Sequence, residues 1–253
     1  MPDNDAFKTF PALSGYTFSV STRKPNRKLN EDLRDFATYT IPEAALFLGI
    51  PQRTLAEWFS SPGGLLRASV SGRGGQLLSF IDTVEAYAIF LLRSHHHLTM
   101  QSIRRALIEL PLHTKEKHPL VSENLKVFED FLLYDRPADG TNARHVINLS
   151  ENGQLVIPHV VDIFANRVHR NSDGKTVAMF PWRFWENDQD SKPVQLDPAV
   201  MSGRLVLTGT RIPVRMILDR HQRGQSAGQI ADDYGLPVES VEKALQHIDK
   251  KAA

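Results

Sequence analysis

Apolar residues recur at helical spacing in three short blocks near the end of the chain. The blocks run from Val214 to Arg223, from Ser226 to Tyr234 and from Pro237 to Ile248. Gly224 and Gly235 separate the blocks, and glycine ends helices readily because it tolerates a left-handed backbone. Three short helices joined by single-glycine turns are typical of a helix-turn-helix module.

The last of these predicted helices has one apolar face and one polar face. Its spacing predicts that Val241, Leu245 and Ile248 pack inward. Glu239 and Glu242 would repel phosphates, so this second module fits dimerisation rather than contact with the DNA groove. Three polar residues remain as candidate contacts on the outer face: Ser240, Lys243 and Gln246.

A continuous apolar run before the first block predicts a short buried strand. A Gly-Thr turn follows the run, and a proline then fixes φ at the helix entrance. Two uses fit the strand: it pairs across the two-fold axis of a dimer, or it joins a sheet within the chain. The residues of this segment are Leu205, Val206, Leu207, Gly209, Thr210, Arg211 and Pro213.

A second helix pair is predicted near the front of the chain. Thr40 and Glu43 form a capping box at the start of the first helix, and residues 49–51 supply the turn. The second helix is predicted over residues 52–59. In it Leu55, Trp58 and Phe59 lie at i, i+3 and i+4, which predicts a buried stripe.

A glycine-rich turn after this helix pair joins two apolar runs, residues 65–70 and 76–80, and predicts a β-hairpin. Two further helices are predicted over residues 81–93 and 99–110. A helix pair followed by a hairpin is the plan of a winged helix-turn-helix domain. Glutamine and arginine at the start of the second helix suit base edges, and arginines on the hairpin side suit phosphates. The candidate DNA contacts are Gln52, Arg53, Thr54, Arg67 and Arg73.

The middle of the chain predicts a small α+β segment. Strands are expected over residues 128–134, 143–149 and 176–180, with a hairpin turn at residues 173–175. A helix is expected from Pro158 to Val168. Three aromatic residues near its end form either part of the core or a partner surface: Trp182, Phe184 and Trp185.

The predicted fold class is therefore α+β, mainly α, in four parts. Residues 1–37 form a flexible arm with a basic cluster at residues 23–28, which is either a solvated tail or a phosphate contact. Residues 38–110 form the winged helix-turn-helix domain, and residues 111–193 form the central α+β segment. Residues 194–253 form the three-helix helix-turn-helix module with its preceding short strand.

Composition narrows the possible functions. The 253 residues carry a net charge of +1, so nucleic-acid binding would depend on local basic patches. No apolar run approaches about 18 residues, no signal-peptide pattern is present and cysteine is absent, so we expect a cytoplasmic protein without membrane contact. The triplet His95 to His97 points in different directions around a helix, so we expect no metal site. No catalytic motif is present, so we expect neither an enzyme nor a cofactor.

Residues 196–249 resemble domain-of-unknown-function family 433. The shared elements are Gly209 to Val214, Gly224 to Ser226 and Tyr234 to Leu236. Members of that family resemble antitoxins that are encoded beside PIN-like ribonuclease toxins. The resemblance therefore implies a toxin partner for this chain.

The stretch from Thr38 to Leu110 is similar to the DNA-binding domain of MerR-type regulators. Its wing lacks the usual aromatic residue, and the chain lacks the long dimerisation helix and any cysteine effector site. The two resemblances together imply a VapB-type antitoxin that binds operator DNA as a homodimer, represses its own operon and neutralises a PIN-like ribonuclease. The alternative is a stand-alone MerR-like transcriptional regulator without a toxin partner.

Overall fold

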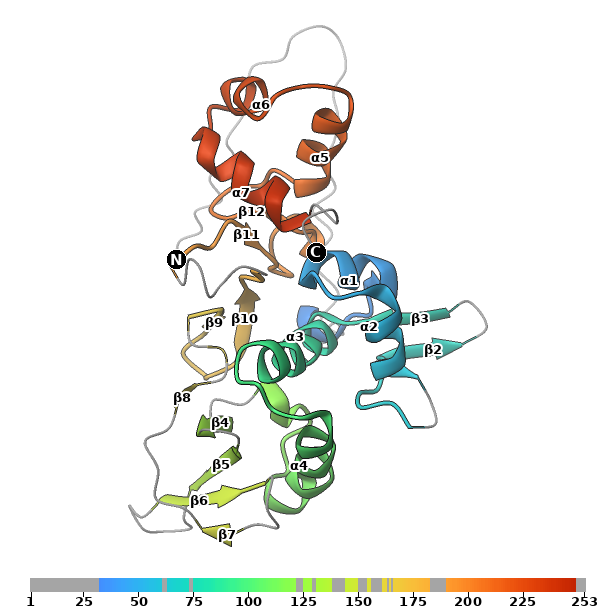
Figure 1. Cartoon of the computed structure of the whole chain (residues 1–253), viewed down its shortest axis with the longest axis vertical. Helices are drawn as coiled ribbons and strands as arrows, with labels where there is room; N and C mark the ends of the chain where they lie inside the picture. The colour runs from blue at the N-terminus through green and yellow to red at the C-terminus, as the bar shows by residue number, and fades with distance from the viewer. Residues whose placement is uncertain are drawn as a thin grey trace, which may run out of the picture. The chain divides into compact units, whose positions relative to one another are not determined.

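The N-terminal elements pair two short helices with a small antiparallel sheet (Figure 1). In this computed structural model the described residues are 32–60, 63–72, 75–121, 125–128, 131–137, 144–149, 154–155, 161–162, 164, 166–182 and 190–248. Residues Asp32–Ala253 form one compact unit. The first elements are η1 (Leu33–Asp35), β1 (Tyr39–Thr40), α1 (Ile41–Leu48), α2 (Gln52–Phe59), β2 (Val70–Gly72) and β3 (Gly75–Leu78).

The sheet of this region has the order β1-β3-β2, and both pairings are antiparallel. Tyr39 of β1 lies opposite Leu78 of β3, and Val70 of β2 lies opposite Leu77. The expected hairpin is therefore present, but its first strand begins at Val70 rather than at residue 65. The stretch before Val70 instead closes back on α2, because the Leu66 amide donates to the Trp58 carbonyl at 2.9 Å.

Helix α3 (Phe80–Ser94) lies at the centre of the core. Ser79 caps its N-terminus in a capping box with Asp82, and most of its residues are buried. It is followed by α4 (Met100–His113), which Thr99 caps, and by η2 (Pro119–Val121). A helix that is apolar on nearly all sides must be covered on nearly all sides, which explains its central place.

The central segment is mainly sheet. One antiparallel sheet has the strand order β7-β6-β5-β4-β8. Its strands are β4 (Leu125–Phe128), β5 (Phe131–Pro137), β6 (Arg144–Asn148), β7 (Gln154–Leu155) and β8 (Val161–Asp162). Helix α4 contacts β5. The helix expected from Pro158 to Val168 is wrong where the structure describes this stretch. Residues 161–162 are in β8, and Val168 begins β9 (Val168–Arg170).

Strand β9 pairs with β10 (Thr176–Met179) through a turn at Asn171–Lys175, as the hairpin signal predicted. The Asn171 side chain accepts from the amides of Asp173 and Lys175, which fixes the turn. Trp182, just after β10, is buried at 3% exposure, which places it in the core. Phe184 and Trp185 lie outside the described residues.

The C-terminal elements are β11 (Val194–Gln195), η4 (Met201–Gly203), β12 (Val206–Leu207), α5 (Val214–Gln222), α6 (Ala227–Tyr234) and α7 (Val238–Ile248). The three helices match the three predicted blocks closely. A capping box of Ser226 and Gln229 begins α6, and Gly235 ends it in the left-handed region at φ 63°. Val241 and Ile248 of α7 are buried as expected, whereas Leu245 is half-buried.

Across the described residues the chain is thus a mixed α+β protein with seven α-helices and small antiparallel sheets. None of these helices has both the length and the apolar character that a bilayer crossing requires.

Candidate nucleic-acid interface

Helix α2 divides its residues cleanly between the core and the surface. Leu55, Trp58 and Phe59 are buried at 0%, 7% and 2% exposure, which confirms the predicted apolar stripe. Gln52 and Arg53 are exposed at the start of the helix, and Thr54 is half-buried. Gln52 and Arg53 therefore face solvent rather than the protein interior.

The charge of Arg53 is partly balanced within the helix. Its Nε lies 3.1 Å from Oε1 of Glu57, one turn later, and the two side chains are 91% and 63% exposed. An exposed i, i+4 pair of this kind contributes little to stability. The arginine can therefore exchange Glu57 for another anion at small cost.

The N-terminus of α2 carries no side-chain cap. Pro51 is its N-cap residue and the first intrahelical bond runs from the Leu55 amide to the Pro51 carbonyl at 3.0 Å. The amides of residues 52–54 precede that bond, and the positive end of the helix dipole lies there. Uncapped amides beside an exposed arginine favour a bound anion such as a phosphate.

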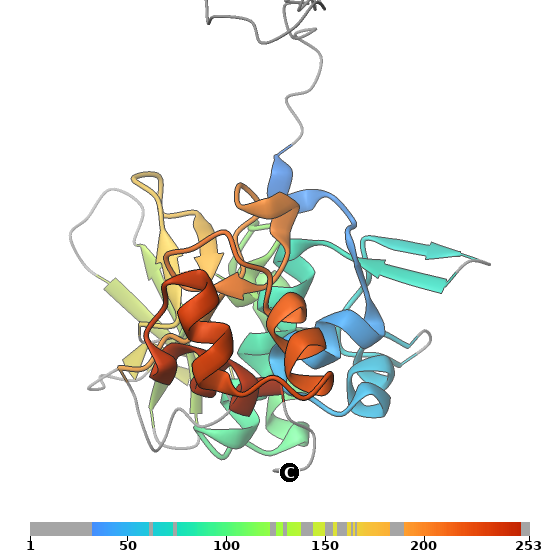
Figure 2. The same ribbon diagram turned by 90° about the horizontal axis from the view of Figure 1, so that it is seen from above.

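Two side-chain contacts fix the β2–β3 hairpin to the helices. The Gln76 side chain donates to the Phe59 carbonyl at 2.7 Å, which ties β3 to the end of α2. Oδ2 of Asp82 accepts from the amide and hydroxyl of Ser69 and from the amide of Ser79. Asp82 thus holds both ends of the hairpin at the start of α3. The hairpin projects beyond the helices in both views (Figure 2).

Arg67 lies in the segment that leads from α2 into this hairpin, and it is exposed. Arg73, expected at the hairpin tip, lies outside the described residues. The structure therefore brings Gln52, Arg53 and Arg67 to exposed positions on one helix and the segment after it.

The candidate residues of α7 are less available than the sequence predicted. Ser240 and Lys243 are half-buried, and only Gln246 of the three is exposed. Nζ of Lys243 lies 3.1 Å from Oε1 of Glu239, so its charge is shared with an acid on the same helix. This helix offers a weaker surface for phosphates than the start of α2 does.

The segment from Leu205 to Pro213 is used within the chain. Residues 206–207 pair with β11 on one side, and Val206 bridges Pro213 on the other. Leu205, Val206 and Leu207 are all buried. Of the two uses left open for this strand, the structure has the intramolecular one, because both edges are occupied and neither can pair with a second copy.

The turn after this strand is built as its sequence predicts. Gly209 adopts a left-handed φ of 74°, and the Thr210 hydroxyl donates to the Leu207 carbonyl at 2.9 Å. Pro213 is the N-cap of α5 at φ −62°, and Arg211 is exposed.

A cavity of about 440 Å³ lies beside the candidate interface. The start of α2, the turn before it and the end of α7 line it, through residues such as Gln52, Gly49 and Ile248. His247 also lines this cavity, and its Nε2 lies 2.7 Å from the Phe47 carbonyl of α1. The C-terminal helix therefore contacts the N-terminal helix pair and leaves Gln52 and Arg53 exposed.

Several residues that build this region have little or no local pattern in the sequence that would identify them. Gln76, Asp82 and His247 act through partners far along the chain or across a hairpin. Only the capping position of Asp82, three residues after Ser79, was visible in the sequence as a pattern.

Comparisons with known proteins agree with this architecture. Residues 194–247 match the family model described as a protein of unknown function, DUF433. “Putative antitoxin VapB45” of Mycobacterium tuberculosis is 24% identical over 233 residues, which span 85% of this chain and 95% of that protein. The crystal structure of Rv2018 from Mycobacterium tuberculosis has a similar fold, with a TM-score of 0.57 and 22% identity over 83% of this chain and 97% of that chain.

These matches support a family related to toxin–antitoxin systems. The expected resemblance of the C-terminal region to family 433 is confirmed.

Proposed function

We propose that the chain is the antitoxin of a type II toxin–antitoxin system. In this proposal it binds operator DNA as a homodimer, represses its own operon and neutralises a PIN-like ribonuclease. The observation that carries the proposal is the match to a protein named as an antitoxin, which extends over nearly the whole of both chains.

The N-terminal region is the proposed winged helix-turn-helix domain. Helix α2 is the recognition helix, with Gln52 and Arg53 directed to base edges and Thr54 beside them. The β2–β3 hairpin is the wing, and Arg67 and Arg73 bind phosphates. The support is the exposure of α2 at its uncapped N-terminus, next to a hairpin that Asp82 and Gln76 hold in place.

The C-terminal three-helix module has a different proposed role. Its last helix carries Glu239 beside Lys243 and exposes Glu242, a poor match to a phosphate backbone. Protein contact suits this surface better, either between two protomers or with the toxin. Because β12 is enclosed within its own chain, the dimer contact must use another surface.

Binding to a fragment from upstream of the chain's own gene tests the DNA interface. We expect Arg53→Ala to weaken binding by about 5- to 100-fold, because a bidentate arginine contact to a base contributes about 1–3 kcal/mol. Arg67→Ala and Arg73→Ala should weaken binding to all sequences and reduce the salt slope by about one. Fluorescence anisotropy at several salt concentrations measures both effects.

Arg215→Ala is the matched control. Like Arg53 it is almost fully exposed and lies one turn before an acid, with its Nε 4.0 Å from Oδ2 of Asp219. It lies on α5, outside the proposed interface, so its removal should leave affinity unchanged. If Arg215→Ala weakens binding and Arg53→Ala does not, the DNA interface belongs to the C-terminal module.

The toxin partner is tested with the product of the adjacent gene. We expect a PIN-like protein encoded there to co-purify with this chain and to lose ribonuclease activity in the complex. The alternative function is a stand-alone regulator with the same DNA interface. Operator binding without any association between the two gene products would favour that alternative and contradict the antitoxin role.

A further inference from the structure

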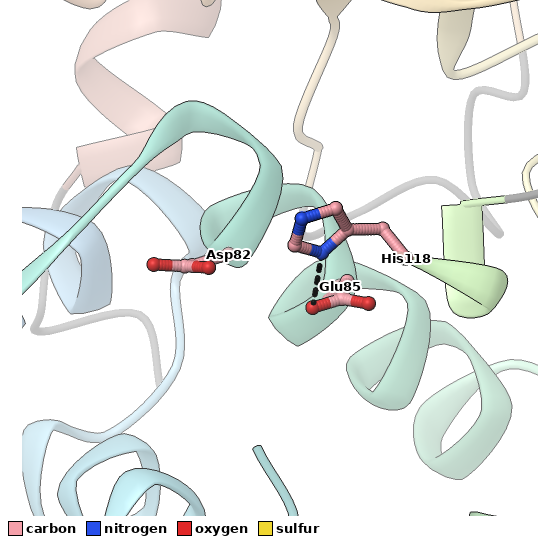
Figure 3. Close-up of side chains that lie close together, drawn as sticks. All are labelled: Asp82, Glu85 and His118. Atoms are coloured by element: carbon pink, nitrogen blue, oxygen red, sulfur yellow. Dashed lines mark ion pairs between the residues drawn. The ribbon is translucent and has the colours of Figure 1, made fainter. Parts of the chain in front are cut away.

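Three potential metal ligands meet on the side of α3, outside the proposed DNA interface. Asp82 and Glu85 lie one turn apart on α3, and His118 approaches them from the segment between α4 and the central sheet (Figure 3). One ligand atom from each residue lies within 4.8 Å of the other two. Residues i and i+3 share a helix face, so α3 presents both carboxylates to the same place.

The burial of these carboxylates makes the cluster unusual. Asp82 is 2% exposed and Glu85 is 9% exposed. Within the part of the chain that the structure describes, no lysine or arginine forms an ion pair with either of them. Two buried carboxylates one turn apart are costly unless a cation compensates their charge.

His118 completes the set. Its Nδ1 lies 3.4 Å from Oε2 of Glu85, and its Nε2 lies 3.9 Å from Oδ1 of Asp35. The Glu85–His118 separation equals the edge of a tetrahedron around Zn²⁺, about 3.4 Å for ligands about 2.1 Å from the ion. The two side chains also form an ion pair with each other at this distance.

Asp82 already has a structural role, and that role leaves room for a cation. Its Oδ2 accepts the three hydrogen bonds from Ser69 and Ser79, whereas its Oδ1 accepts none of them. Hydrogen bonds to a ligating carboxylate orient it and are typical of metal sites. Reaching a common ion requires the ligand atoms, which lie within 4.8 Å of one another, to close by at most about 1.4 Å, which side-chain rotation can supply.

We propose that Asp82, Glu85 and His118 bind one divalent transition-metal ion of the Zn²⁺ class. One imidazole and two carboxylates suit Zn²⁺, and an imidazole ligand disfavours Mg²⁺. The ion would join α3 to the segment that leads into the central sheet. One of its ligands, Asp82, is also the residue that holds the β2–β3 hairpin through Ser69 and Ser79.

The test is Zn²⁺ binding by the full-length, chelator-treated protein, measured by isothermal titration with the bound metal counted by mass spectrometry. We expect one equivalent of Zn²⁺, which Mg²⁺ does not displace, and a higher melting temperature with Zn²⁺ present. Glu85→Gln and His118→Gln should each weaken binding more than tenfold and remove the Zn²⁺-dependent rise in melting temperature. Circular dichroism in metal-free buffer verifies that both variants fold.

The triple variant His95→Asn, His96→Asn, His97→Asn is the matched control, because a histidine triplet can attract Zn²⁺ by itself. This variant should retain the single equivalent. Loss of binding only in the triplet variant would overturn the proposal. So would a wild-type protein that binds no Zn²⁺, or binding that survives in both Glu85→Gln and His118→Gln.

Discussion

Buried polar side chains do much of the positioning in this molecule. Asp82 holds both ends of the hairpin, and the Tyr39 hydroxyl donates to the Gly203 carbonyl at 2.7 Å. The Tyr87 hydroxyl accepts from the Trp182 amide at 3.3 Å. Each bond joins segments that lie far apart in the chain or on opposite sides of a hairpin. A buried hydrogen bond of this kind costs about 1–3 kcal/mol when one partner is removed.

Tyr87 should make the stability of the protein decrease at alkaline pH. Burial raises the pKa of Tyr87 to about 12, from an ordinary value of 10.0. The unfolded chain therefore releases the phenol proton first, and the stability that the neutral phenol provides is intact below pH 10 and declines as pH rises towards 12. At pH 11 the loss should be about 1 kcal/mol relative to neutral pH.

The Tyr87→Phe variant removes this titration. We expect its free energy of unfolding to fall less between pH 8 and pH 11 than that of the wild type, as measured by urea unfolding at each pH. The difference at pH 8 reports the lost hydrogen bond to Trp182, and the difference in slope reports the ionisation. Equal slopes for the two proteins would show that Tyr87 does not titrate as proposed.

The candidate site was predictable only where helical spacing decides it. Leu55, Trp58 and Phe59 define one face of α2, so the exposure of Gln52 and Arg53 followed from the same spacing. The contacts that place this helix beside its hairpin involve Gln76 and Asp82, and no local pattern identifies their partners.

At the scale of elements, caps explain which predictions succeeded. Thr40 and Glu43, and likewise Ser226 and Gln229, form complete capping boxes, and the helices that they start were predicted nearly to the residue. The stretch from Pro158 to Val168 has a proline start and apolar content, but among its described residues Val161–Asp162 form the short strand β8 and Val168 begins β9. Strands of two or three residues are set by their neighbours in space and leave little signal in the sequence.

Two glycines of α6 allow a paired test of how this helix is built. Gly235 ends the helix at φ 63°, and an added Cβ would meet no atom within 4 Å. Gly235→Ala should therefore cost about 1 kcal/mol of unfolding free energy through backbone strain alone. Gly228 lies inside the helix, where a Cβ would meet only Ser226 Oγ at 3.9 Å.

Gly228 is the second residue of α6, so the Gly228→Ala variant should stabilise the protein by up to about 0.5 kcal/mol, because alanine favours helix more than glycine does. Chemical denaturation of the two variants beside the wild type measures both changes. Opposite signs are the expected result. Stabilisation by both changes would mean that the cap geometry of Gly235 does not control the end of α6.

At the scale of the whole molecule, the sequence indicated the parts but not their contacts. The N-terminal helix pair and the C-terminal three-helix module were both predicted from local patterns. The bonds between Tyr39 and Gly203 and between Phe47 and His247 join these regions across most of the chain. A single sequence offers no periodicity that pairs residues at such separations.

His247 tests how strongly these regions depend on each other. Its ring is fully buried and stacks on the Trp182 ring, with the two ring centroids 5.8 Å apart. Its Nε2 lies 2.7 Å from the Phe47 carbonyl oxygen. A carbonyl only accepts, so Nε2 carries the proton of this bond. The His247→Ala variant would remove a buried ring and leave that carbonyl unpaired, which should cost about 2–4 kcal/mol.

His221 provides the control for this last prediction, because its Nδ1 lies 3.0 Å from the Gln225 carbonyl at an exposed position. The His221→Ala change should alter the free energy of unfolding by no more than about 0.5 kcal/mol. Hydrogen exchange then separates local from global effects: in His247→Ala the amides of α1 and α7 should both lose protection, although only α7 carries the substitution. Loss of protection in α7 alone would mean that the two regions unfold independently, and that the contact with Phe47 contributes little to the stability of the N-terminal helix pair.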